Sequence, residues 1–259
     1  MIAKGHIPVL VMAGALAALA FPPARAANPE AEALIRQGDA AVRALDAPAA
    51  LEFFDEAAKA DPDDAQILLR ISQQYSNLIA KAKTPAEGLG YAQRSLDEAK
   101  QAEALAPDNP KAHLAVAVAY GRLTDFEDNR TKVEYSRYVK AEADKTLELD
   151  PKEDYAYHVL GRWNYSVATL GSMMKLMAKL VYGGMPDASL AEAERDFKKA
   201  IEIAPQRVIH HHELARVYVA EGKMDDARKE WQTELTLKPE DNEGENDQKE
   251  AQAELEKKN

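Results

Sequence analysis

Apolar residues recur along most of this chain every three to four positions, which is the spacing of amphipathic helices. The helical segments come in pairs, and five of these pairs end at a proline. The five residues are Pro62, Pro107, Pro151, Pro205 and Pro239. Because the residue before a proline is driven out of the helical conformation, each proline ends one helix and restarts the chain. The pattern therefore predicts an all-α protein built from five helix pairs.

The first and last pairs place small and aromatic residues at the positions typical of the tetratricopeptide (TPR) repeat. In Ala31–Asp64 these residues are Gly38, Ala50, Phe54, Ala57 and Pro62. In Val208–Asp241 they are Leu214, Ala215, Tyr218, Gly222, Ala227, Trp231 and Pro239. Small residues let two antiparallel helices pack closely, and aromatic side chains fill the remaining space. We expect a TPR-like right-handed superhelix over residues 27–241, whose concave side binds another chain.

The inner repeats are enlarged, because successive prolines are 45, 44, 54 and 34 residues apart. The helices expected there are Ala65–Lys83, Ala86–Leu105, Pro110–Leu123, Lys132–Leu149, Asp154–Leu170, Ser172–Tyr182 and Ser189–Ile203. The fourth repeat thus contains an inserted apolar helix with Met173–Val181 at its centre. An apolar stripe at helical spacing is typical of a core. We expect this helix to pack inside or over the superhelix, with partner contact as the alternative.

Both ends of the chain differ from the repeats. Lys4, an apolar run over Ile7–Phe21 and the small residues around Ala26 predict a signal peptide, residues 1–26, cleaved after Ala26. An uncleaved anchor is the alternative. The mature chain is then expected to be periplasmic or secreted. At the other end, Glu240–Asp247 is acidic and loop-like, and residues 242–259 are expected to form a polar tail or a capping helix.

Composition excludes several classes of function. The formal net charge is −11, and loss of residues 1–26 makes it −13, which argues against nucleic acid and against anionic lipid bound by a basic face. The chain has no cysteine and therefore no disulfide or thiolate zinc site. Phosphate-loop and hydrolase motifs are absent from the sequence. We expect no catalysis, no cofactor and no membrane span in the mature chain.

The fourth repeat resembles one particular family. The string Leu160-Gly161-Arg162-Trp163-Asn164-Tyr165, the inserted helix and Lys111-Ala112-His113 make the chain similar to the regulator of microtubule dynamics family over Ala33–Pro239. The resemblance implies a TPR-like helical adaptor and not a catalyst. Eukaryotic members are associated with microtubules and organelle contacts. Here the predicted secretion signal stands in place of an organelle anchor, so the resemblance implies the fold without the named activity.

The inner face of the superhelix is the expected binding surface. In a TPR array, positions 2, 5, 9 and 12 of the first helix of each repeat face the groove. The expected ligand contacts at these positions are Tyr155, His158, Arg162, Tyr165, His212 and Arg216. Arg122, which follows the last groove position of the third repeat, is expected to join them. Because guanidinium groups bind carboxylates bidentately, we expect a protein or peptide partner, with an acidic or C-terminal segment favoured. The alternative is that the arginines pair with acids of the chain itself.

The run His210-His211-His212 invites a metal interpretation. Consecutive helical residues point about 100° apart, so these three side chains do not face one ion. We expect no metal site, and we expect His211 and His113, at the same repeat position, to be structural.

The predicted function is a non-catalytic adaptor. The alternatives are a carrier of a small apolar ligand or lipid in a pocket lined by the Met173–Val181 helix, and a structural subunit of a cell-envelope assembly.

Overall fold

The computed structural model describes residues 28–183, 187–239 and 242–257, and within these ranges the chain forms helices and no strand. The predicted signal peptide, residues 1–26, lies outside the described residues. In chain order the helices are α1 (Pro29–Arg43), α2 (Ala47–Ala60), α3 (Ala65–Ile79), α4 (Pro85–Leu105), α5 (Pro110–Leu123), the 3₁₀ helix η1 (Thr124–Phe126), α6 (Asn129–Leu149), α7 (Asp154–Ala168), α8 (Ser172–Tyr182), α9 (Leu190–Ile203), α10 (Val208–Ala220), α11 (Met224–Glu234) and α12 (Asn242–Glu256).

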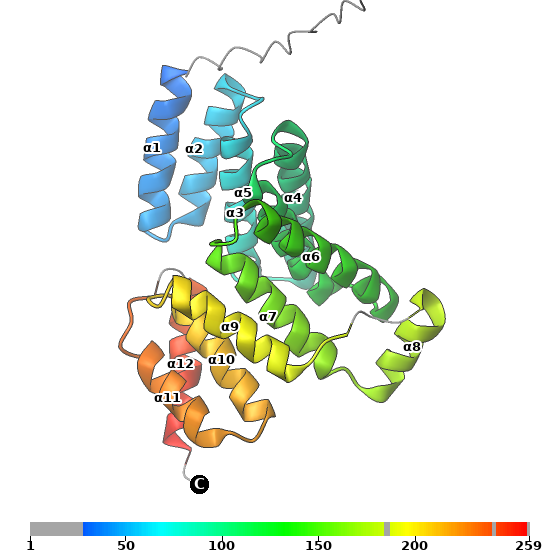
Figure 1. Ribbon diagram of the computed structural model, residues 1–259. Helices are drawn as coiled ribbons and strands as arrows, with labels where there is room; N and C mark the ends of the chain where they lie inside the picture. Colours follow the sequence, from blue (N-terminus) through cyan, green and yellow to red (C-terminus); the bar gives the residue numbers. More distant parts are fainter. Residues whose placement is uncertain (1–27, 184–186, 240–241, 258–259) are drawn as a thin grey trace, which may run out of the picture.

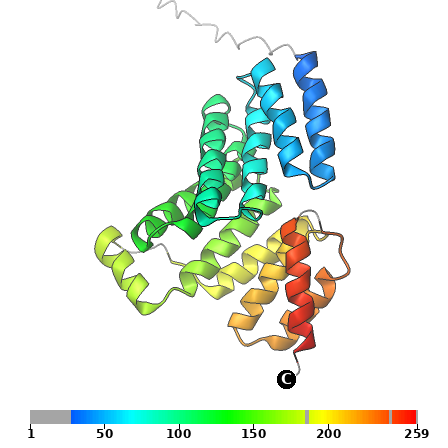
Figure 2. The ribbon, with the colours of Figure 1, turned by 180° about the vertical axis from the view of Figure 1, so that it is seen from behind.

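The helices pack as a stack of antiparallel pairs, as the proline spacing predicts (Figures 1 and 2). The described pairs are α1/α2, α3/α4, α5/α6, α7/α9 and α10/α11, and the second helix of each pair packs on the first helix of the next. Buried residues form three successive apolar clusters along the stack. The predicted all-α, TPR-like architecture is confirmed.

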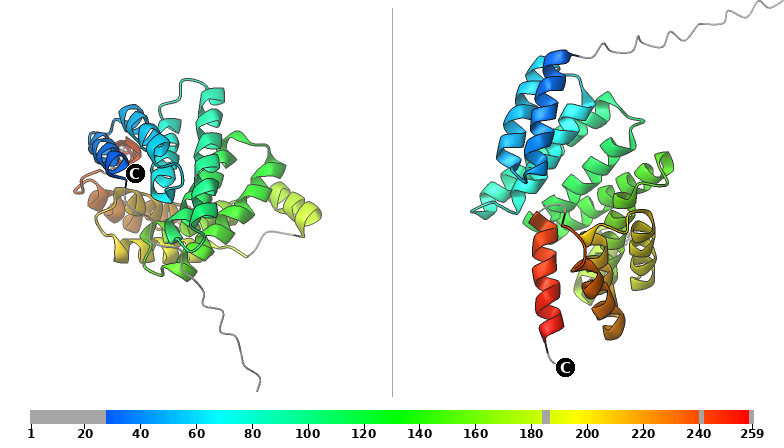
Figure 3. Two further views of the ribbon diagram at one scale, coloured as in Figure 1. Left: turned by 90° about the horizontal axis from the view of Figure 1, so that it is seen from above. Right: turned by 90° about the vertical axis from the view of Figure 1, so that its left-hand side faces the viewer.

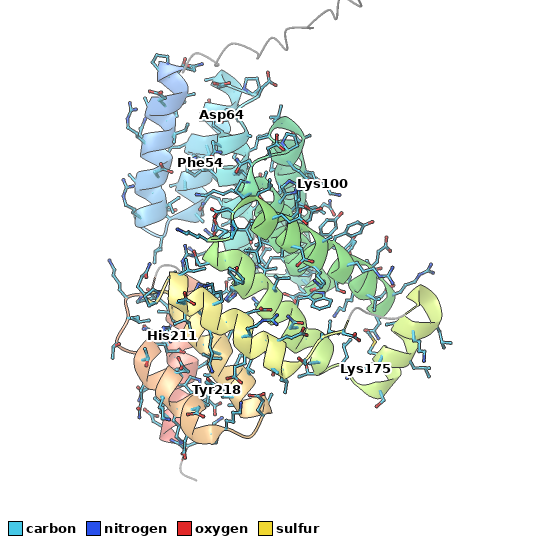
Figure 4. The ribbon with its side chains drawn as sticks, viewed as in Figure 1. Phe54, Asp64, Lys100, Lys175, His211 and Tyr218 are labelled. Carbon is cyan, nitrogen blue, oxygen red and sulfur yellow. The ribbon has the colours of Figure 1, made fainter. Side chains whose placement is uncertain are left out.

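Close helix contact inside a pair depends on glycine. A Cβ atom on Gly38 would lie 2.3 Å from the ring of Phe54 of α2, which is labelled in Figure 4. A Cβ atom on Gly161 would lie 2.8 Å from the ring of Phe197. Both rings are fully buried. Each glycine thus lets an aromatic ring from the second helix of the pair lie against the backbone of the first.

The inserted helix α8 is formed where it was expected, but it projects from the stack (Figure 1). Leu176 and Leu180 are 51% and 76% exposed, so the expectation that this helix packs inside or over the superhelix is wrong for these two side chains. Ala178 is buried, and α8 contacts α6. Despite the apolar character of α8, no helix among the described residues has both the length and the hydropathy needed to cross a bilayer.

The last helix, α12, is the capping helix that was one alternative for residues 242–259, and it extends into the acidic segment that was expected to be loop-like. Residues 240–247 were expected to be loop-like, yet α12 begins at Asn242 and packs on α10 and α11. Gly244 approaches Val208 of α10, where an added Cβ would lie 3.6 Å away. Seen from the side, α12 runs from the middle of the molecule toward its C-terminal end (Figure 3). Contact with the last repeat therefore makes this acidic segment helical despite its weak local propensity.

Candidate functional site

Three arginines of the first helices of successive repeats lie on one inner surface. Arg122 of α5, Arg162 of α7 and Arg216 of α10 are connected through two carboxylates, Glu213 and Glu243; we call these five residues the inner arginine cluster. Arg122 donates to both oxygens of Glu243, with an Nη1–Oε1 distance of 3.2 Å. Arg162 lies 3.4 Å from Glu213 and 3.9 Å from Glu243. The repeat positions predicted Arg162 and Arg216 on the inner face with Arg122 beside it, and in the structure these three side chains share the carboxylates of Glu213 and Glu243.

The acids in the cluster come from the chain itself. Arg216 donates to both oxygens of Glu213 at 2.9 Å and lies over the ring of Tyr165, 5.1 Å from its centroid. Burial disfavours ionisation of Glu243, but the hydrogen bond and charge of Arg122, together with the charge of Arg162, outweigh burial and lower the pKa of that carboxyl. The arginines therefore pair internally, which was the alternative left open above. The side chains of Arg162 and Arg216 nevertheless remain 43% and 44% exposed.

His158 lies below this surface in a network with α10. Its Nδ1 atom is 3.1 Å from Nδ1 of His210, and Nε2 of His210 is 2.9 Å from Oδ2 of Asp154. Tyr155 stacks on the His158 ring with centroids 4.9 Å apart. Burial, followed by the nearby His210, lowers the pKa of His158 well below its usual value. His158 is therefore an uncharged, buried group that connects α7 to α10.

The three consecutive histidines point to three different places. His210 faces Asp154 of α7, and Nδ1 of His211 lies 2.7 Å from Glu230 of α11. His212 is buried, with Nδ1 3.3 Å from Glu234 and Nε2 3.7 Å from Glu250 of α12. The three rings do not converge, as the helical geometry requires. His212 thus connects α10 with α11 and α12 beneath the inner surface.

A cavity of about 330 Å³ lies between α5, α6 and α7. Its apolar wall includes Val139, Val159 and Trp163, and its polar lining includes Arg122 and Arg162. Met174 of α8 also lines it. The cavity therefore joins an apolar interior to the inner arginine cluster, and its described lining comes mainly from repeats three and four.

The predicted site residues are thus brought together, with different exposures. Arg122, Tyr155, His158 and Arg162 line the cavity, and Tyr165 and Arg216 form the next part of the same surface. His212 lies away from the cavity. Sequence reasoning missed Glu213 and Glu243. Glu213 is three positions before Arg216, which is a signal for pairing within a helix. Glu243 is 121 positions from Arg122, and no local pattern connects them.

Solved structures with similar architecture are TPR proteins. A TPR protein of Thermus thermophilus superposes with a TM-score of 0.63 and 18% identity, covering 86% of this chain and 99% of that one. MamA of Desulfovibrio magneticus superposes with a TM-score of 0.50 and 14% identity, covering 80% and 94%. At these identities the likeness establishes the fold alone.

Sequence comparisons identify one family. Regulator of microtubule dynamics protein 2 of Bos taurus is 27% identical over 168 residues, which are 64% of this chain and 41% of the relative. The human protein 2 is 29% identical over 143 residues, covering 55% and 35%. The chain thus matches well under half the length of these curated relatives. The family model described as regulator of microtubule dynamics protein 1-3 matches residues 31–259, and the chain therefore belongs to this family.

Proposed function

We propose that this protein is a non-catalytic adaptor that holds a segment of a partner protein against the inner arginine cluster. The observation that carries the proposal is the convergence of Arg122, Arg162 and Arg216 from three successive repeats on one surface of an acidic protein. Arginine and tyrosine are the residue types that dominate binding energy at interfaces. The partner segment is expected to be acidic, because guanidinium groups prefer carboxylates.

The internal contacts support the same ligand chemistry. Glu243 meets Arg122 through two oxygens, which is the bidentate geometry of a bound carboxylate. A partner carboxylate at this point would replace Glu243, whereas Arg162 and Arg216 have exposed surface for additional contacts. A role at microtubules, which the relatives' names describe, is not part of the proposal, because the predicted export would separate the chain from tubulin.

A peptide titration tests the adaptor proposal. We expect the full chain to bind a glutamate-rich peptide in preference to its glutamine analogue, with affinity decreasing as salt rises. The double variant Arg162→Ala plus Arg216→Ala should lose that preference. Arg36→Ala plus Arg195→Ala removes two exposed arginines elsewhere and serves as the matched control. Equal binding by both double variants would contradict the proposal.

A second function is favoured by the cavity. Its apolar wall with two arginines in the lining suits a small amphipathic molecule that carries an anionic group, so the chain would act as a carrier. Native mass spectrometry of the purified chain should then show a bound molecule. Val159→Trp should displace it by filling the cavity, whereas Val219→Trp on the exposed face of α10 should not. Detection of only the ligand-free mass would contradict the carrier function.

We also propose that the chain acts outside the cytoplasm, on the strength of the signal-peptide pattern in residues 1–26. N-terminal sequencing of the protein recovered from cell fractions tests this. The expected mature chain begins at Ala27 and is found in the periplasmic or secreted fraction. Recovery of a cytoplasmic chain that retains residues 1–26 would contradict the proposal.

A further inference from the structure

Two carboxylates from two helices converge on one imidazole nitrogen of a third helix, away from the inner arginine cluster. Nδ1 of His113 on α5 lies 2.7 Å from Oε2 of Glu142 on α6 and 3.1 Å from Oε1 of Glu103 on α4. The three ligand atoms all lie within 4.8 Å of one another. His113 is buried, and both carboxylates are partly buried. We propose that His113, Glu103 and Glu142 bind a divalent first-row metal ion, with Zn²⁺ the best match to one imidazole and two carboxylates.

The other nitrogen of His113 supports this assignment. Nε2 of His113 lies 2.8 Å from the carbonyl oxygen of Pro107, so it donates its hydrogen there. A histidine that binds a metal through one nitrogen characteristically donates the other N–H to a carbonyl or carboxylate, which fixes the ring. The contact leaves Nδ1 directed at the two carboxylates. Zinc sites combine histidine and carboxylate ligands at about 2.0–2.1 Å, and three protein ligands leave a fourth position for water.

The last repeat holds an internal comparison. His211 occupies the same repeat position, with Nε2 3.0 Å from the carbonyl of Pro205 and Nδ1 2.7 Å from Glu230. The position that corresponds to Glu103, ten residues before the histidine, is Ile201 there. The shared geometry of ring, proline carbonyl and one glutamate is therefore the structural use of this position. Glu103 is the addition that turns it into a set of three ligands.

The electrostatics of the cluster favour a cation. Burial raises the pKa of Glu103, and the neighbouring Glu142 raises it further, because two carboxylates share one small space. His113, followed by Lys100 on α4, acts in the opposite direction on the pKa of Glu103. A divalent ion would neutralise both carboxylates and replace the proton on Nδ1 of His113. The ion would join α4, α5 and α6, and hence repeats two and three.

Calorimetric titration of Zn²⁺ into the chelator-treated full chain, without a histidine tag, tests the site. The absorption spectrum with Co²⁺ provides a second readout. We expect one saturable site, a rise in melting temperature with Zn²⁺, and a Co²⁺ spectrum typical of four-coordination. Glu103→Gln retains the contacts of His113 to Glu142 and Pro107, so it should fold and lose the site. His211→Gln removes the comparison histidine and should bind Zn²⁺ as the wild type does.

Two results would overturn the proposal. One is the absence of saturable Zn²⁺ binding by the wild-type chain, which would make the three residues a structural ion-pair cluster. The other is equal binding by wild type and Glu103→Gln, which would place the ion elsewhere. If this second result came with loss of binding in His211→Gln, the ion would lie in the last repeat.

Discussion

Arg122 of α5 and Glu243 of α12 form a two-oxygen ion pair although 121 positions separate them in the sequence. The contact joins the middle repeat to the helix that follows the last repeat. Because Arg162 also lies 3.9 Å from Glu243, a single carboxylate of α12 faces two of the three arginines on the inner surface. The C-terminal helix therefore both closes the last repeat and occupies part of the proposed binding surface.

Glu243→Gln should release this part of the surface. Loss of the charge leaves the half-buried Arg122 without its partner, so we expect the free energy of unfolding to fall by about 1–3 kcal/mol. Affinity for a glutamate-rich peptide should rise, because Arg122 becomes available. Urea denaturation and peptide titration measure the two effects.

Glu245→Gln changes an exposed acid on the same helix and should alter stability by less than about 0.5 kcal/mol. Unchanged peptide affinity in Glu243→Gln would show that Arg122 does not contact the ligand.

Asp247 of α12 should make the protein less stable at neutral and alkaline pH than in acid. Burial, opposed by His212 and reinforced by Glu243, raises the pKa of this carboxyl to about 7. The folded state therefore binds a proton that the unfolded state releases, and stability falls as pH rises from about 4 to 7. Asp247→Asn removes this effect, so its free energy of unfolding should exceed that of wild type by about 1–2 kcal/mol at pH 8 and match it near pH 4.5. Asp225→Asn on the exposed side of α11 is the control. If Asp247→Asn raised the free energy of unfolding equally at both pH values, the assignment to Asp247 would be contradicted.

The parts of the structure that sequence predicted are those set by contacts within one repeat. Gly38 with Phe54 and Gly161 with Phe197 occupy fixed repeat positions, so spacing alone placed each helix pair. The groove positions likewise predicted that Arg162 and Arg216 share a face, with Arg122 beside it. In each case the information lies within a few tens of residues, because a repeat contacts chiefly its neighbours.

Contacts between distant segments were not predictable in this way. An apolar stripe has the same spacing whether the helix is buried or projecting, so α8 was misjudged at Leu176 and Leu180. The acidic segment around Glu243 reads as a loop until Arg122 and α10 are placed beside it. Glu103, His113 and Glu142 come from three helices, and no motif marks them as a set.

His211 should contribute more stability in acid than in alkali. Burial lowers its pKa, but Glu230 and the carbonyl of Pro205 outweigh burial and raise it above the usual value. Both ring nitrogens face oxygen acceptors, so the charged ring fits best. The contribution is complete below about pH 6.5 and is lost as pH rises through the folded-state pKa. His211→Gln should therefore cost about 1–3 kcal/mol at pH 5.5 and clearly less at pH 9, as measured by denaturation of metal-free protein. A cost that is the same at both pH values would show that the ring is not charged in the folded state.

Two glycines of similar helical setting should respond in opposite directions to alanine. A Cβ atom on Gly161 would lie 2.8 Å from the buried ring of Phe197, which has no room to move, so Gly161→Ala should lower the free energy of unfolding by about 1–3 kcal/mol. A Cβ atom on Gly121, in the last turn of α5, would meet no atom within 4 Å apart from its chain neighbours and the backbone of its own helix. Gly121→Ala should therefore raise the free energy of unfolding by about 0.5–1 kcal/mol through helix propensity. Thermal denaturation of the two variants measures both. A stabilising effect of Gly161→Ala would show that the contact between α7 and the ring of Phe197 does not require glycine. The physical reason given for small residues at this repeat position would then be wrong.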